Sequence, residues 1–198
     1  MQAQTSLKLA RISLLSLALG LCVSMGAYAK ELNNPLSFSA ENLISGKMET
    51  IDFKKAEKGT VLVFLSAKCP CSLNHEPRIA ELAKKFKPKG FKFFGIHSNK
   101  SHPVDKAKEH FQKEARLPFP VYDDSKIVLA ERFSASATPH AYVVSPEGKT
   151  LFRGGVDSSH DTTEAKEHYL MDALDAISSE TPKKYIEEIF VLGCAIDR

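Results

Sequence analysis

The sequence predicts an α/β fold in which helices flank a central mixed β-sheet. Residues 60–66 form a continuous apolar run, typical of a strand that is buried on both faces. The segment that follows carries apolar side chains at helical spacing, namely Ile79, Leu82, Ala83 and Phe86. Residues 91–96 form a second apolar run. A strand, a helix and a strand in this order indicate parallel βαβ pairing.

Further elements follow along the chain. Residues 103–115 are expected to form a helix, followed by a short strand at 121–122 and a helical turn over 127–133. Residues 141–145 and 150–153 flank a Pro-Glu-Gly-Lys sequence, which is typical of a β-hairpin turn. These segments predict a sheet that contains both parallel and antiparallel strands.

Two segments nearer the ends complete the prediction. Residues 38–53 contain short extended stretches around a Ser-Gly turn, which predicts an N-terminal β-hairpin extension. Asp161 is followed three residues later by Glu164, which resembles the capping box of a helix. We therefore expect a last long helix, with its apolar face between residues 169 and 177.

Residues 1–29 have the pattern of a secretory signal peptide. Lys8 and Arg11 precede an apolar run, and small residues at the end of that run provide a cleavage site after Ala29. The remaining residues, 30–198, suffice for one domain. We therefore expect an exported, periplasmic, single-domain protein with no membrane segment after cleavage.

Charge and cysteine content narrow the function. Residues 1–29 hold two of the 27 basic residues and none of the 24 acidic ones, which leaves a formal net charge of +1. This balance gives no sign of a nucleic-acid partner. Three of the four cysteines remain, Cys69, Cys71 and Cys194. In an oxidising compartment, an odd number suggests one pair and one free thiol.

Cys69 is the expected nucleophile. It lies where the predicted buried strand gives way to a helix, and the unpaired N–H groups and the dipole at a helix start stabilise a thiolate. The neighbouring Lys68 would act in the same direction if its ammonium group were close. A thiolate at this position can attack a disulfide or a peroxide.

The order of elements and several motifs resemble the redoxin group of the thioredoxin superfamily. The strand before Cys69-Pro70, the Thr138-Pro139 pair and the hairpin over residues 142–153 carry this resemblance. It includes the peroxiredoxin-like alkyl hydroperoxide reductases and thiol-specific antioxidant proteins, and it covers nearly all of residues 30–198.

The resemblance implies a thioredoxin-like fold and thiol-disulfide or antioxidant activity. It implies no organic cofactor, and a thiol or disulfide protein, or a peroxide, as the partner. It also implies that Pro139 follows a cis peptide bond and faces the cysteine, with Thr138 beside it. The alternative from the residues alone is that Pro139 is an ordinary proline that opens an edge strand.

The residues around Cys69 depart from the patterns of this superfamily. Peroxiredoxins have a Thr or Ser four residues before the peroxidatic cysteine and a proline before that, whereas here Leu65 lies four residues before Cys69 and no proline precedes it. This departure argues against peroxide reduction. Thioredoxin-type motifs have two residues between their cysteines, whereas here Ser72 occupies the place of the second one. The usual resolving cysteine is therefore missing.

Two cysteines could replace it. Cys71 could pair with Cys69, although the small ring of a Cys-X-Cys disulfide is strained and easily reduced. Cys194 could instead return from the C-terminal tail and resolve Cys69 or Cys71, and its Gly-Cys context slightly favours this arrangement. Both alternatives stay open at the level of sequence.

A metal-binding function is the alternative hypothesis. Cys69, Cys71 and His75 place two sulfur ligands and an imidazole within seven residues, a donor set that suits Cu(I). His140, beside Pro139, could complete such a site. The simpler explanation is that His75 lies on a solvated helix face.

Overall fold

The computed structural model describes residues 37–179 and 189–198. The predicted signal peptide lies outside these residues, so it stays a prediction. The elements run in the order β1 (Ser37–Glu41), β2 (Met48–Asp52), β3 (Gly59–Leu65), α1 (Pro70–Phe86), β4 (Phe91–His97), α2 (Val104–Lys113), β5 (Val121–Asp123), α3 (Val128–Phe133), β6 (Ala137–Thr138), β7 (His140–Val144), β8 (Thr150–Gly154), α4 (Tyr169–Ser178) and β9 (Cys194–Ala195). Single-turn 3-10 helices follow β2 at Phe53–Lys55 and α1 at Lys87–Lys89.

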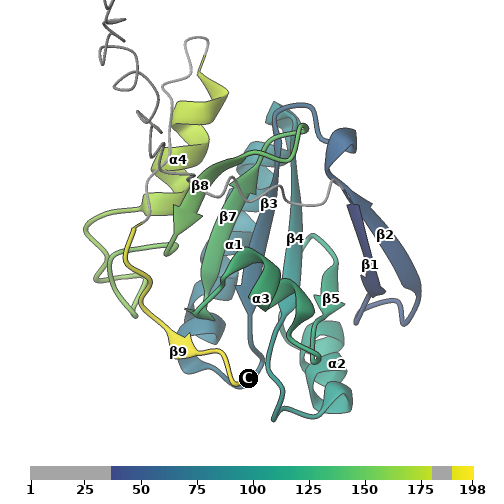
Figure 1. Ribbon diagram of the computed structural model, residues 1–198. Helices are drawn as coiled ribbons and strands as arrows, with labels where there is room; N and C mark the ends of the chain where they lie inside the picture. The colour runs from purple at the N-terminus through teal and green to yellow at the C-terminus, as the bar shows by residue number, and fades with distance from the viewer. Residues whose placement is uncertain (1–36, 180–188) are drawn as a thin grey trace, which may run out of the picture. The chain divides into compact units, whose positions relative to one another are not determined.

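The central sheet has five strands in the order β5-β4-β3-β7-β8 (Figure 1). Strand β3 pairs in parallel with β4 and antiparallel with β7, so the predicted mixed sheet is confirmed. Every residue of β3 is buried, as expected for the middle strand of a sheet that is covered on both faces. The parallel register places Leu65 beside His97, at the end of the sheet from which the chain leads to Cys69.

The two faces of the sheet have separate cores. On one face, Val61, Val63 and Leu65 of β3 pack in a cluster with apolar residues of α1, α2 and α4. On the other face, Leu62 and Phe64 belong to a second cluster with residues of α3 and of the β1–β2 hairpin. This division follows from the alternation of side chains along a strand.

The predicted N-terminal hairpin is also confirmed. Strands β1 and β2 pair antiparallel from Ser37 opposite Asp52 to Glu41 opposite Met48. The backbone N–H of Leu43 donates to the carbonyl of Val121 at 2.8 Å, which joins the hairpin to the edge strand β5. The hairpin therefore extends the fold at the β5 edge.

The capping box predicted at Asp161 is wrong, because α4 begins only at Tyr169. Asp161 Oδ1 accepts hydrogen bonds from the N–H and the hydroxyl of Thr163, which closes a short turn. The backbone N–H groups of Lys166 and Glu167 both donate to Ser158 Oγ, each at 3.0 Å. Since side chains satisfy these N–H groups, residues 158–168 form an irregular loop.

Within residues 37–179 and 189–198, no helix is long and apolar enough to span a membrane.

Candidate active site

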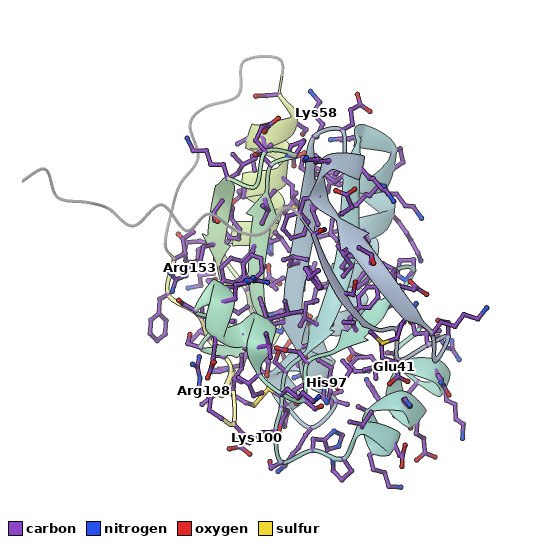
Figure 2. All side chains as sticks on the ribbon, turned by 45° about the vertical axis from the view of Figure 1, so that its right-hand side comes forward. Glu41, Lys58, His97, Lys100, Arg153 and Arg198 are labelled. Carbon is purple, nitrogen blue, oxygen red and sulfur yellow. A yellow bond between two sulfur atoms is a disulfide. The ribbon has the colours of Figure 1, made fainter. Side chains whose placement is uncertain are left out.

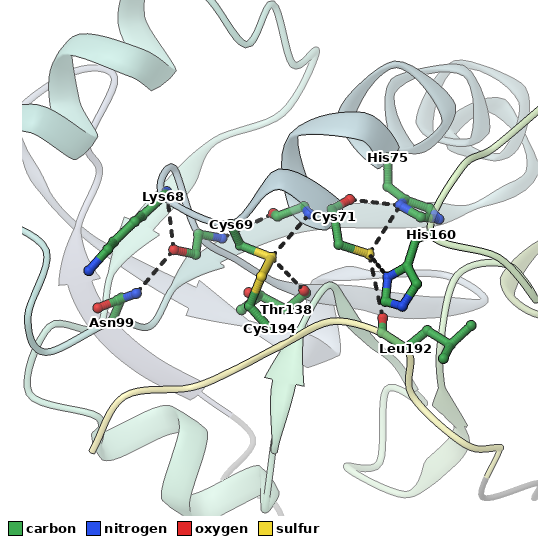
Figure 3. Close-up of a disulfide and its surroundings, with 11 residues drawn as sticks. Lys68, Cys69, Cys71, His75, Asn99, Thr138, His160, Leu192 and Cys194 are labelled. Atoms are coloured by element: carbon green, nitrogen blue, oxygen red, sulfur yellow. Dashed lines mark hydrogen bonds between the residues drawn. A yellow bond between two sulfur atoms is a disulfide. The ribbon is translucent and has the colours of Figure 1, made fainter.

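Cys69 caps the N-terminus of α1. The helix begins at Pro70, and proline at the first helical position already has the required φ angle. The N–H of Ser72 donates to Cys69 Sγ at 3.4 Å (Figure 3). The sulfur of Cys69 therefore lies at the positive end of the helix dipole, among the N–H groups that have no partner within the helix.

Cys69 and Cys194 form a disulfide bond, with their Cα atoms 5.9 Å apart and a sequence separation of 125. Strand β9 carries Cys194 and pairs antiparallel with β6, where Thr138 is opposite Cys194. Cys71 is a free thiol. Of the two partners that the sequence left open for Cys69, the structure therefore contains the one from the C-terminal tail.

The peptide bond between Thr138 and Pro139 is cis. The carbonyl oxygen of Thr138 lies 3.1 Å from Cys69 Sγ, and Figure 3 shows Thr138 beside the disulfide. In the reduced state, a Cys69 thiol at this distance can donate a hydrogen bond to that carbonyl. Pro139 and Thr138 thus lie beside the cysteine, where the redoxin resemblance expects them.

His140 follows the cis-proline and is almost completely buried. Burial, followed by the positive charge of Arg153, lowers its pKa from 6.5 to about 3. The imidazole is therefore neutral, and its Nδ1 accepts a hydrogen bond of 3.3 Å from the N–H of Ser136. A neutral His140 supplies no positive charge to a thiolate at Cys69.

Lys68 supplies no nearby charge either. Its side chain is exposed, and Figure 3 shows its ammonium group pointing away from Cys69. The backbone N–H of Lys68 donates to Ser66 Oγ at 3.3 Å, which fixes the turn between β3 and α1. The groups that would stabilise a Cys69 thiolate are therefore the N–H groups and the dipole at the start of α1.

Ser72, in the place of a second thioredoxin-type cysteine, has a structural role. It is fully buried, and its Oγ accepts a hydrogen bond of 3.0 Å from the N–H of Ser66. This bond satisfies a buried backbone donor just beyond the end of β3. Ser72 thus anchors the helix to the strand that precedes it.

Cys71 has different surroundings from Cys69, although only Pro70 separates them. Its Sγ lies 3.2 Å from His160 Nδ1 and 3.8 Å from His75 Nδ1. The side chain is buried, and burial raises the pKa of the Cys71 thiol. A thiol in this position is less ionised at neutral pH than an exposed cysteine.

The buried carboxylate of Asp157 lies close to His75. His75 Nδ1 is 2.7 Å from the Cys71 carbonyl and therefore carries the proton that it donates there, while its Nε2 lies 3.8 Å from Asp157 Oδ2. His168 Nδ1 donates to Asp157 Oδ1 at 2.7 Å, and Arg78 lies 3.6 Å from the same oxygen. Asp157 thus connects α1 to the loop before α4.

The copper set of Cys69, Cys71 and His75 is not assembled in this state. Cys69 is bonded to Cys194 and has no thiolate to offer, and the Nδ1 proton of His75 is engaged by a carbonyl. Across the residues that the structure describes, no group of three or more His, Cys, Asp or Glu side chains is placed to hold a metal ion.

Sequence reasoning missed His160 and Asp157. Both lie in the irregular segment between β8 and α4, where no helical or strand period relates a residue to the cysteines. His160 is 89 residues from Cys71 in sequence. The one signal was a Gly-Val-Asp-Ser sequence at residues 155–158 that resembles the redoxin group, and it gave no partner for the aspartate.

Comparison with known proteins identifies the family. Residues 33–152 match the AhpC/TSA family over more than half of the chain. The chain belongs to the AhpC/TSA family. The redoxin resemblance predicted from the motifs is thereby confirmed.

Individual relatives agree with this assignment. The chain is 28% identical over 144 residues to the thiol-disulfide oxidoreductase ResA of Bacillus cereus, which covers 70% of this chain and 80% of that protein. An uncharacterized conserved protein from Geobacillus kaustophilus has a similar structure, with a TM-score of 0.73, 25% identity and coverage of 84% of this chain and 90% of the other. This AhpC/TSA protein is a thiol-disulfide oxidoreductase.

A further structure shares the fold. The secreted Mycobacterium tuberculosis disulfide oxidoreductase homologous to Escherichia coli DsbE superposes with a TM-score of 0.53 at 20% identity. The match covers 75% of this chain and 98% of that one. The thioredoxin-like fold class is thereby confirmed, with the β1–β2 hairpin as its N-terminal extension.

Proposed function

We propose that Cys69 and Cys194 form the redox-active pair of this thiol-disulfide oxidoreductase. In the reduced protein, the Cys69 thiolate attacks a disulfide of a partner protein, and one partner sulfur leaves as a thiolate. Cys194 then attacks Cys69 Sγ and displaces the second partner sulfur. The partner gains two electrons and the protein ends with the Cys69–Cys194 bond. The reverse sequence oxidises a dithiol partner.

The single observation that carries this proposal is the bond between Cys69 and Cys194. It joins the capping residue of α1, whose position favours a thiolate, to a tail strand that pairs with Thr138 beside Pro139. We infer that Thr138 and Pro139 shape the surface on which the partner's sulfur approaches Cys69. No organic cofactor is needed, because electrons pass from thiol to thiol.

We further propose that the enzyme works outside the cytoplasm. Residues 1–29 would direct export and be removed, leaving residues 30–198 as one redoxin domain. An oxidising compartment such as the periplasm suits a protein that carries a disulfide. The secreted disulfide oxidoreductase with the same fold is consistent with this location.

Reduction of insulin by dithiothreitol tests the proposal on the purified residues 30–198. We expect turnover in the parent and none above background in Cys69→Ser. When Cys194→Ser is reduced, freed of dithiothreitol and then mixed with insulin, a mixed disulfide should accumulate, because the thiol of Cys194 no longer remains to displace the bound partner. Full activity of Cys69→Ser would refute the assignment. Consumption of hydrogen peroxide that is lost in Cys69→Ser would show that peroxide is a second substrate.

A further inference from the structure

The C-terminal residues lie along the short strand that precedes the cis-proline. Beyond the β6–β9 pairing, the N–H of Ile196 donates to the carbonyl of Ser136 at 3.0 Å. The N–H of Lys100 donates to the carbonyl of Asp197 at 3.3 Å, and Figure 2 shows Lys100 and Arg198 at the end of the sheet where His97 lies. The tail thus lies as an extended strand along residues 136–138, and we call the surface that it covers the groove.

Two tail positions fit the groove in a sequence-specific way. A Cβ atom at Gly193 would collide with the carbonyl of Thr138, which is backbone and cannot turn away. Ile196 is only 6% exposed and belongs to the buried cluster that includes Phe64 and Phe133. Ala195, between the bonded cysteine and Ile196, is exposed. The groove therefore selects side chains before and after the cysteine.

The chain connection does not by itself hold the tail in this groove. Strand β6 has only two residues, and its partner β9 is likewise two residues long and comes from the other end of the domain. The main-chain groups of β6 can be paired by any extended segment, as in other cases of strand addition. The covalent tie at Cys194 is removed by reduction, which is the state that would meet a partner disulfide.

We infer that the groove beside Pro139 binds an extended segment of the partner protein, and that the tail is a built-in stand-in for it. The segment would have glycine directly before its reactive cysteine and an aliphatic residue two positions after it. This inference rests on the proposed function of Cys69 and names the class of segment that Cys69 attacks.

In this scheme, attack of Cys194 on the mixed disulfide and release of the partner occur together. Cys69 forms a disulfide with the cysteine of the docked segment, while the other partner sulfur leaves as a thiolate and takes a proton from solvent. The returning tail occupies the same groove, and Cys194 attacks Cys69 Sγ. The partner cysteine leaves as a thiolate at the moment when its segment is displaced. The partner is reduced by two electrons, which come from Cys69 and Cys194.

A peptide of residues 190–198 tests the inference in trans. Its cysteine is blocked by thionitrobenzoate, and attack of Cys69 on the peptide sulfur releases the coloured thiolate. The protein is residues 30–198 with Cys71→Ser and Cys194→Ser, so that Cys69 is its one thiol. Because burial of an isoleucine is lost, we expect a peptide with Ile196→Asp to react at least about tenfold more slowly. Gly193→Val should slow it as well.

The matched control is a peptide with Ala195→Asp, which adds the same charge at an exposed position. We expect it to react within about twofold of the parent peptide. Equal rates for all four peptides would overturn the inference while leaving Cys69 as a reactive thiol. Failure of Cys69 to react with any peptide, and also with dithionitrobenzoate, would refute the proposed function itself.

Ile196→Asp in the protein itself should speed the reaction that Ile196→Asp in the peptide slows. Ile196→Asp in the protein weakens docking of its own tail, so the parent peptide should react several-fold faster with this variant. Ala195→Asp in the protein should not accelerate it. A slower reaction of the folded Ile196→Asp protein, checked by circular dichroism, would overturn the inference. The peptide series keeps the test decisive if that variant does not fold.

Discussion

Cys69 and Cys71 stand on either side of Pro70 but lie in contrasting environments. Cys69 caps α1, receives an N–H at its sulfur and is bonded to the C-terminal tail. Cys71 lies within the first turn, buried between two histidines, and burial raises the pKa of its thiol. A Cys-X-Cys spacing therefore does not make the two cysteines equivalent, because one residue along a helix start changes which groups a side chain faces.

The largest difference is expected in activity. Cys69→Ser should reduce insulin reduction to the uncatalysed rate, because a hydroxyl does not ionise at neutral pH and cannot attack a disulfide. Cys71→Ser should keep the rate within a few-fold of the parent. Initial rates with dithiothreitol as reductant measure both. Loss of activity in Cys71→Ser alone would remove the distinction between the two cysteines.

Stability should separate the same two positions. The disulfide closes a loop across 125 residues, so Cys194→Ser should lower the free energy of unfolding by about 2–4 kcal/mol through the entropy of the unfolded chain. Cys71→Ser, which removes no covalent cross-link, should lower the free energy of unfolding by about 1 kcal/mol or less. Urea unfolding of the unreduced proteins measures both values. Equal losses would indicate that the bond contributes nothing to stability.

The buried His140 predicts that the stability of the protein depends on pH. His140 has a pKa of about 3 in the folded protein because of burial, against 6.5 when unfolded. As the pH falls below 6.5 the unfolded chain binds the proton first, so stability declines towards pH 3. Between pH 7 and 5 this amounts to about 2 kcal/mol.

His140→Asn tests that dependence. The asparagine oxygen can accept the N–H of Ser136 as Nδ1 does, but the side chain does not titrate. Urea unfolding at pH 7 and pH 5 should show a smaller acid loss in the variant than in the parent, by about 2 kcal/mol. An identical loss in the two proteins would show that His140 is not the group responsible.

The smallest effect concerns reactivity in the reduced protein. Cys69 faces the start of α1 whereas burial raises the pKa of Cys71, so Cys69 should react with iodoacetamide about tenfold faster at neutral pH. Pulsed alkylation followed by peptide mass spectrometry measures the two rates within one sample. Faster alkylation of Cys71 would contradict the contrast between the two environments.

Much of the fold could be predicted from the sequence because its signals are local. The buried run of β3, the apolar period of α1 and the turn before β8 each lie within one segment. The place of Pro139 beside the cysteine was implied by the resemblance to the redoxin group. The capping-box pattern at Asp161 misled, since the same side chain also stabilises a turn and the surrounding N–H groups found side-chain acceptors.

The site itself depends on contacts that no local pattern encodes. The choice between Cys71 and Cys194 as the partner of Cys69 is set by the pairing of β6 with β9 across the domain. His160 reaches Cys71 from an irregular loop, and Ser72 satisfies a backbone donor of the preceding strand end. The sequence could predict Cys69 as the nucleophile, but only the fold specifies which residues surround it.

The central claim is that Cys69 and Cys194 are the working redox pair. Peptide mapping by mass spectrometry of unreduced residues 30–198, with free thiols blocked before digestion, tests it most directly. We predict a peptide that links Cys69 to Cys194, together with a Cys71 that carries the blocking group. Incubation with a reducing protein partner should convert the linked form to free thiols. A Cys69–Cys71 linkage, or three free thiols in the oxidised protein, would contradict it.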